Sequence, residues 1–110
     1  MAISIEEIVY KEYGKCVEIS NGTVDVVVTV DVGPRIIRFG FTGKENMFCE
    51  VPQTTQPVDE PVGGVWKMKG GHRLWHSPEN MPRSYIPDDA PVEWCKIENG
   101  IKVKQKVEPW

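Results

Sequence analysis

The chain has 110 residues, of which 40% are hydrophobic and 26% are charged, with a formal net charge of −3. This length allows one domain with a modest core, and the acidic balance argues against a nucleic-acid partner, because phosphate recognition needs a basic patch. The N-terminus lacks the charged and apolar regions of a signal peptide, and no apolar run approaches the length of a membrane span, so we expect a cytoplasmic protein without a membrane partner.

The three cysteines, Cys16, Cys49 and Cys95, have no short spacing between any two of them. This spacing excludes a CxxC metal or redox motif and argues against a disulfide framework. We therefore expect reduced thiols that pack as small apolar residues.

The N-terminal part of the chain predicts antiparallel strands. Residues 1–13 fit neither the helical nor the strand period and predict a short strand or a turn. Asn21-Gly22 then supplies the two positive-φ residues that a tight hairpin favours. The even-numbered valines from Val24 to Val32 occupy every second position, opposite the polar residues Thr23, Asp25, Thr29 and Asp31, which predicts a half-buried antiparallel strand.

The next segments predict one more strand pair and then an irregular region. Gly33-Pro34 ends the valine strand, and the strand Arg35 to Phe41, the turn Thr42 to Asn46 and the short strand Met47 to Glu50 follow. Residues 51–91 hold most of the prolines, which exclude a long central strand across most of this region, because proline cannot donate to a ladder. Their aromatic residues favour a functional loop system over a linker.

The C-terminal residues predict a second hairpin. Val92 to Glu98 pairs through Asn99-Gly100 with Ile101 to Val107, in which aliphatic residues and lysines alternate. The whole pattern predicts an all-β fold, an antiparallel β-sandwich formed by a single domain over residues 1–110 with a long Pro/Gly-rich loop region.

Candidate functional residues gather in residues 70–79, GGHRLWHSPE, which hold both histidines of the chain. Trp75 can stack on the apolar face of a sugar ring, or it can be a core tryptophan. The hydrogen-bonding residues around it, His72, Arg73, His76 and Glu79, favour a sugar site.

A metal site is not expected at these histidines. His72 and His76 have helical metal-ligand spacing, but the preceding glycines and Pro78 leave little room for a helix. In an extended segment, residues four apart lie roughly 13 Å from each other, which is too far to share an ion.

Arg35 has two interpretations. It can point a cation into a ligand groove, or it can pair with Asp31 or Glu50 at a sheet edge; the second role is common for arginines at strand ends and is the one we favour.

Two motifs together resemble those of galactose mutarotase-like (aldose 1-epimerase-related) proteins, most closely an uncharacterised branch of that superfamily. They are DVGPRII at 31–37, after Asn21-Gly22 and the valine strand, and GGHRLWHSPE at 70–79. The resemblance spans about residues 10–109 and implies part of a β-supersandwich with a sugar site on its concave sheet and no cofactor.

The resemblance also implies roles for individual residues. In the epimerases a histidine acts as general acid on the ring oxygen and a glutamate as base. His76 is the preferred general acid here, with Arg35, His72, Arg73, Trp75 and Glu79 binding the substrate. Glu79 lies too near in sequence to be recast as the base, and the segment that supplies the base in the family is missing.

Family members are longer, so we expect the domain to be incomplete and to self-associate as a homo-oligomer that covers its open apolar face. The leading hypothesis is a carbohydrate-binding, aldose-epimerase-like domain with weak or no catalysis. The alternatives are a working aldose mutarotase completed by oligomerisation, and a structural β fragment without a small-molecule ligand.

Overall fold

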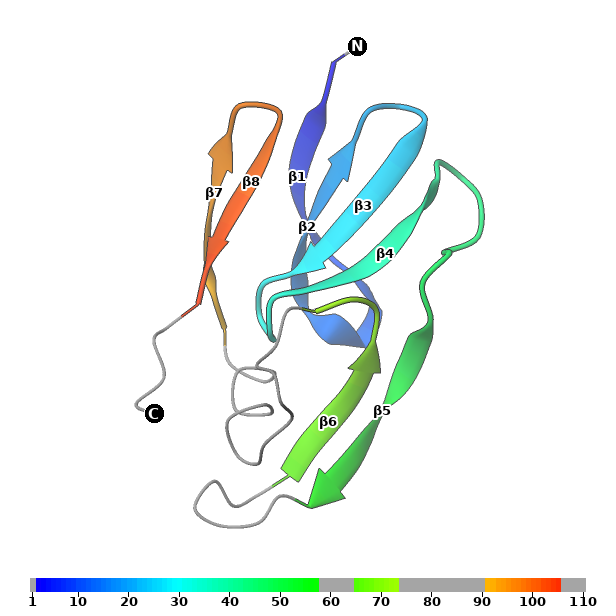
Figure 1. The fold of residues 1–110 in the computed structure, drawn as a ribbon, viewed down its shortest axis with the longest axis vertical. Coiled ribbons are helices and arrows are strands. Elements are labelled where there is room, and N and C mark those ends of the chain that lie inside the picture. Colours follow the sequence, from blue (N-terminus) through cyan, green and yellow to red (C-terminus); the bar gives the residue numbers. More distant parts are fainter. Residues whose placement is uncertain (1, 58–64, 74–90, 106–110) are drawn as a thin grey trace.

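The computed structural model describes residues 2–57, 65–73 and 91–105, and these ranges form antiparallel β-structure (Figure 1). Four strands form one sheet in the order β1-β2-β3-β4, and two hairpins form two further sheets, β5-β6 and β7-β8. The strands are β1 (Ser4–Val9), β2 (Lys15–Ser20), β3 (Val24–Thr29), β4 (Arg35–Phe41), β5 (Glu50–Pro57), β6 (Val65–Gly70), β7 (Glu93–Ile97) and β8 (Gly100–Lys104). The predicted all-β, sandwich-like fold is confirmed. In the described ranges, no helix has the length and apolar character needed to cross a membrane.

The sequence predicted a short strand or a turn for residues 1–13, and the structure contains both. After β1, the 3-10 turn η1 (Lys11–Tyr13) leads into β2, and Tyr13 is buried. The rings of Tyr10 and Tyr13 stack with their centroids 6.3 Å apart. This turn therefore contributes aromatic side chains to the core of the four-stranded sheet.

The core lies on the sheet face opposite the even-numbered valines. It consists of Tyr13, Cys16, Val27 and Ile37, and Ile8 and Tyr10 pack against it. Opposite residues of an antiparallel pair share a face of the sheet. Val27 pairs with Arg38 and Val28 with Ile36, so the register shifts here and β4 has one extra residue, Ile37. This bulge brings Ile37 into the core.

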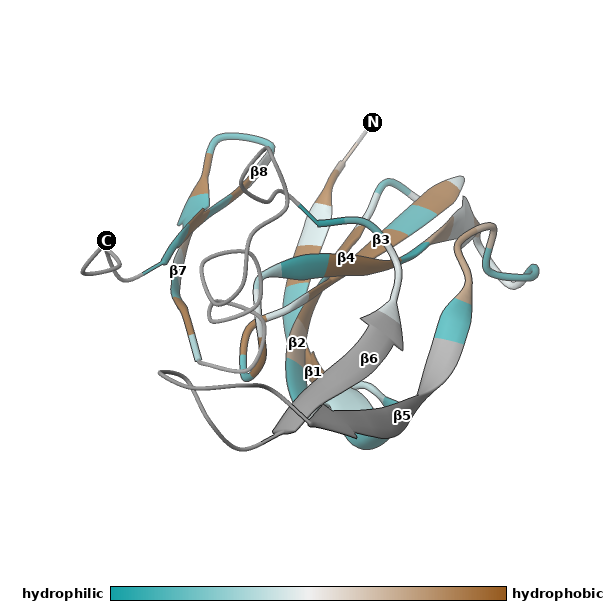
Figure 2. Ribbon diagram, turned by 60° about the horizontal axis from the view of Figure 1, so that its bottom comes forward, coloured by the Kyte–Doolittle hydropathy of each residue, from teal (hydrophilic) through white to brown (hydrophobic). Residues whose placement is uncertain are grey.

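The valine strand is buried on both of its faces at its C-terminal end. Val28 on one face is 8% exposed, and Thr29 on the other is fully buried. The prediction of a half-buried strand is thus correct only for its first residues, of which Val24 and Val26 are partly exposed. Figure 2 shows hydrophobic residues along both β3 and β4.

The structure of residues 47–57 and 65–70 differs from the sequence prediction. The predicted short strand from Met47 is absent, because these residues bend until β5 begins at Glu50. β5 and β6 then pair as an antiparallel hairpin inside the region that we expected to form loops. The prolines explain how a strand is tolerated there: Pro52 falls within the register shift between Glu50 and Thr54, and Pro57 ends β5.

A carboxylate at the start of β5 ties this hairpin to η1. Glu50 accepts hydrogen bonds from the Tyr10 hydroxyl at 2.9 Å and the Asn46 amide at 2.8 Å, and it forms an ion pair with Lys11. Partial burial opposes ionisation of Glu50, but the hydrogen bonds from Lys11, Asn46 and Tyr10 outweigh it and lower the pKa of the carboxyl group.

Candidate functional site

The segment that follows β6 docks on the edge of β4. Ile36 and His72 form an isolated antiparallel bridge with two N–H···O=C bonds of 2.8 Å. The Gly71 amide donates to the Cys49 carbonyl at 2.8 Å, and φ at Gly71 is +71°. A Cβ atom at Gly71 would collide with the Ile36 carbonyl oxygen and lie 3.0 Å from the Ile37 Cα. The glycine therefore allows a close approach of this segment to β4.

Arg35 joins β4 to the same segment. It lies at the first position of β4, is 7% exposed, and its Nη1 donates to the Gly70 carbonyl at 2.6 Å. The two carboxylates considered as its partners have contacts of their own: Asp31 accepts from the Lys15 amide at 2.8 Å, and Glu50 belongs to the cluster with η1. Arg35 is also one of the residues that line a groove.

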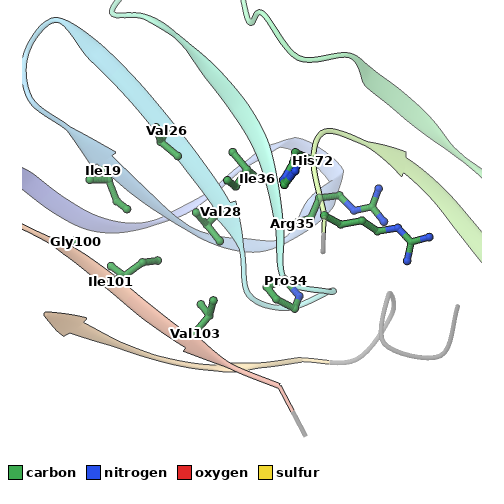
Figure 3. A pocket seen from close by; sticks show the side chains of 11 residues that line it. Ile19, Val26, Val28, Pro34, Arg35, Ile36, His72, Gly100, Ile101 and Val103 are labelled. Atoms are coloured by element: carbon green, nitrogen blue, oxygen red, sulfur yellow. The ribbon is translucent and has the colours of Figure 1, made fainter. Parts of the chain in front are cut away.

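That groove is a cavity of about 470 Å³ between the valine face of the sheet and the β7-β8 hairpin (Figure 3). Its sheet side and its hairpin side are lined by aliphatic residues, and Arg35, His72 and Arg73 also line it. The full lining is Ile19, Val26, Val28, Pro34, Arg35, Ile36, His72, Arg73, Gly100, Ile101 and Val103. The hairpin is held at its base, where the Val92 amide donates to the Val30 carbonyl at 2.8 Å.

Half of the predicted site can be located. The structure brings Arg35, from β4, together with His72 and Arg73, from the segment after β6, in one cavity lining. The His72 side chain is exposed and that of Arg73 is partly buried. Trp75, His76 and Glu79, the other predicted site residues, lie outside the described residues.

The aliphatic part of this cavity was missed by the sequence analysis. Ile19, Val26, Val28 and Ile36 occupy one face of the sheet, and Ile101 and Val103 face them from β8. The signal was present as alternation in both segments, but alternation does not reveal which two apolar faces oppose each other.

The cysteines fulfil the packing prediction at one position. Cys16 is fully buried, and this burial raises the pKa of its thiol to about 11. Cys49 and Cys95 are exposed, so the prediction that they are packing residues is wrong. Among the described residues, no group of three or more His, Cys, Asp or Glu side chains could hold a metal ion.

Comparisons of the chain with protein-family models, with curated proteins and with solved structures gave no match.

Proposed function

We propose that this chain is a carbohydrate-binding domain of aldose-epimerase-like type, with weak or no catalysis on its own. One observation carries the proposal: Arg35, from β4, and the consecutive residues His72 and Arg73, from the segment after β6, line the same cavity. The resemblance of residues 70–79 to galactose mutarotase-like proteins supplies the ligand class.

The side chains suit the recognition of hydroxyl groups. A guanidinium group carries five N–H donors in a fixed fork, and an imidazole can both donate and accept. The Nη1 atom of Arg35 donates to the Gly70 carbonyl, which ties β4 to the end of β6 close to His72 and Arg73.

Binding is favoured over turnover by the composition of the lining. Anomer interconversion needs a general acid and a general base at opposite ends of one bond system. The described residues that line the cavity include no carboxylate to act as that base. We therefore expect this chain to bind an aldose without accelerating its mutarotation measurably in polarimetry.

The test is an amide-resolved NMR titration with a panel of aldoses. We expect localised shifts at residues 70–73 and at Arg35, and His72→Ala should weaken the affinity by up to about tenfold through the loss of a hydrogen bond. The substitution spares the bridge to Ile36, which uses backbone atoms only. Lys44→Ala, at an exposed position in the turn after β4, is the control and should leave the affinity unchanged. A dispersed spectrum that no aldose perturbs would refute the proposal.

A further inference from the structure

The pair Asn-Gly, which predicted the two hairpin turns, occurs twice in the chain, at Asn21-Gly22 and at Asn99-Gly100. Both asparagines are exposed and lie between paired strands, in turns that Figure 1 shows at the same end of the molecule. Asparagine before glycine is chemically labile, because a residue without Cβ lets its backbone nitrogen reach the asparagine side chain. The two pairs therefore place the same chemistry in two structural settings.

The side chain of Asn21 is held by its own turn. Its Oδ1 atom accepts hydrogen bonds from the amides of Thr23 at 2.9 Å and Val24 at 2.8 Å. The Gly22 amide, whose nitrogen is the one that would attack Asn21, donates to the Ser20 hydroxyl at 3.1 Å. This turn also joins β2 to β3, the two central strands of the four-stranded sheet. A reaction at Asn21 thus requires these three hydrogen bonds to break at a well-supported turn.

Asn99 lies in a weaker setting. In the described part of the chain, no hydrogen bond holds its side chain. Gly100 pairs with Ile97 in the last residue pair of β7-β8, which is a two-stranded sheet, and the contact between Val92 and Val30 holds this hairpin at its other end. Two-stranded hairpins are marginally stable, and local opening costs little where few contacts support the backbone. The turn at Asn99 therefore opens more readily than the turn at Asn21.

We propose that Asn99 is a site of spontaneous deamidation and that the folded structure protects Asn21 from the same reaction. The Gly100 nitrogen forms a bond to Cγ of Asn99, the bond from Cγ to Nδ2 breaks, and the Gly100 amide proton leaves with Nδ2 as ammonia. Water then opens the cyclic imide. Cleavage of its bond to Cγ gives aspartate, and cleavage of its bond to the backbone carbonyl carbon gives isoaspartate. Water is the only co-reactant, and nothing is oxidised or reduced.

The products alter one wall of the cavity. Gly100, Ile101 and Val103 follow Asn99 on β8 and line the cavity. Both products add a negative charge at the turn, and isoaspartate also adds one carbon to the main chain. The turn between Ile97 and Gly100 then becomes longer than the two residues that its register accommodates. We therefore expect isoaspartate, but not aspartate, to weaken the pairing of β7 with β8.

Peptide mapping by mass spectrometry tests the proposal. The folded chain is incubated at neutral pH and physiological temperature, and the converted fraction of each asparagine is followed with time. We expect Asn99 to react at least about tenfold faster than Asn21, because Asn21 must first lose its hydrogen bonds. In guanidinium chloride the structural difference disappears, and the two sites should react at similar rates. Equal rates in the folded chain, or a difference that persists in the denaturant, would overturn the proposal.

Gly100→Ala is the matched variant, since an added Cβ there meets only the Ile97 side chain, at ordinary contact distances. The methyl group hinders the attack on Asn99, so deamidation at Asn99 should slow at least about tenfold. The rate at Asn21, which this variant leaves untouched, should not change. An unchanged rate at Asn99 would show that Gly100 is not the attacking residue and would contradict the assignment.

Amide hydrogen exchange tests the effect on the cavity wall. The isoaspartyl form, separated from the unmodified chain, should lose protection from exchange between Glu93 and Lys104. Asn99→Asp is its control, because it carries the same added charge without the extra carbon, and it should keep that protection. Equal protection in the two forms would refute the effect on the wall.

Discussion

Gly71 shows at the scale of one residue why the glycine pair occurs where it does. Its φ of +71° favours glycine, and the Ile36 carbonyl oxygen occupies the place of a Cβ atom. A glycine pair alone does not reveal what approaches it, because this depends on tertiary contacts that a sequence pattern does not contain.

Gly71→Ala should therefore destabilise the fold by about 3 kcal/mol, because left-handed strain and steric overlap add together. Gly43→Ala is the matched control: φ is +75° there, and nothing lies within 4 Å of an added Cβ. It should cost only the backbone term, about 1 kcal/mol. Urea denaturation measures both variants, and equal losses would show that β4 does not constrain Gly71.

The two hairpins show at the scale of an element how far sequence signals define a turn. In the first hairpin the Asn21 amide donates to the Val24 carbonyl, so the central turn residues are Gly22 and Thr23, one position later than predicted. Gly22 has a positive φ but Asn21 does not, and the Asn21 side chain accepts from the amides of Thr23 and Val24. In the second hairpin Ile97 pairs with Gly100, so the turn residues are Glu98 and Asn99, one position earlier than predicted. Asn-Gly announces a turn, but the cross-strand register decides which residues occupy it.

The second hairpin allows a direct test of this register. Asn99 has φ of +59°, whereas Gly100 is not among the positive-φ glycines, and a Cβ there would meet only ordinary contacts with the Ile97 side chain. Gly100→Ala should be neutral or stabilising by up to about 1 kcal/mol, because it restricts the unfolded chain. Asn99→Ala should destabilise the hairpin by about 1 kcal/mol, since alanine tolerates the left-handed region less well.

Amide hydrogen exchange from Glu93 to Lys104 reports the local stability of this hairpin. If protection falls in Gly100→Ala and persists in Asn99→Ala, the turn residues are Asn99 and Gly100, as the sequence predicted.

At the scale of the whole molecule, alternation and turn residues predicted the antiparallel class and the bounds of β4, from Arg35 to Phe41. They did not predict which face of β3 holds the core, because β3 carries apolar residues on both faces, with Val27 on one and Val28 on the other. Alternation and turn residues also did not predict that Arg35 lies near His72 and Arg73, because the bridge between Ile36 and His72 joins positions far apart in the chain. Only the family resemblance put these three residues in one site.

Part of the valine face of the sheet lies open. Phe39 and Phe41 are 40% and 58% exposed, and they pair with Val26 and Val24 on β3, so all four share one face. Exposed aromatic residues beside partly exposed valines form the kind of apolar surface that associates in water. We propose that a second copy of this chain covers it, and the mean mass in sedimentation equilibrium should rise with concentration above that of a monomer.

Phe41→Lys should shift this equilibrium toward the monomer, because association would then bury an ammonium group against an apolar face. Ile97→Lys is the matched control, since Ile97 is 51% exposed on β7 and the register puts it on the hairpin face opposite Ile101. The control should leave self-association unchanged while adding the same charge, so a general effect of net charge would appear in both variants. A monodisperse monomer for the unsubstituted chain would refute the proposal, and equal dissociation in both variants would place the interface elsewhere than on Phe39 and Phe41.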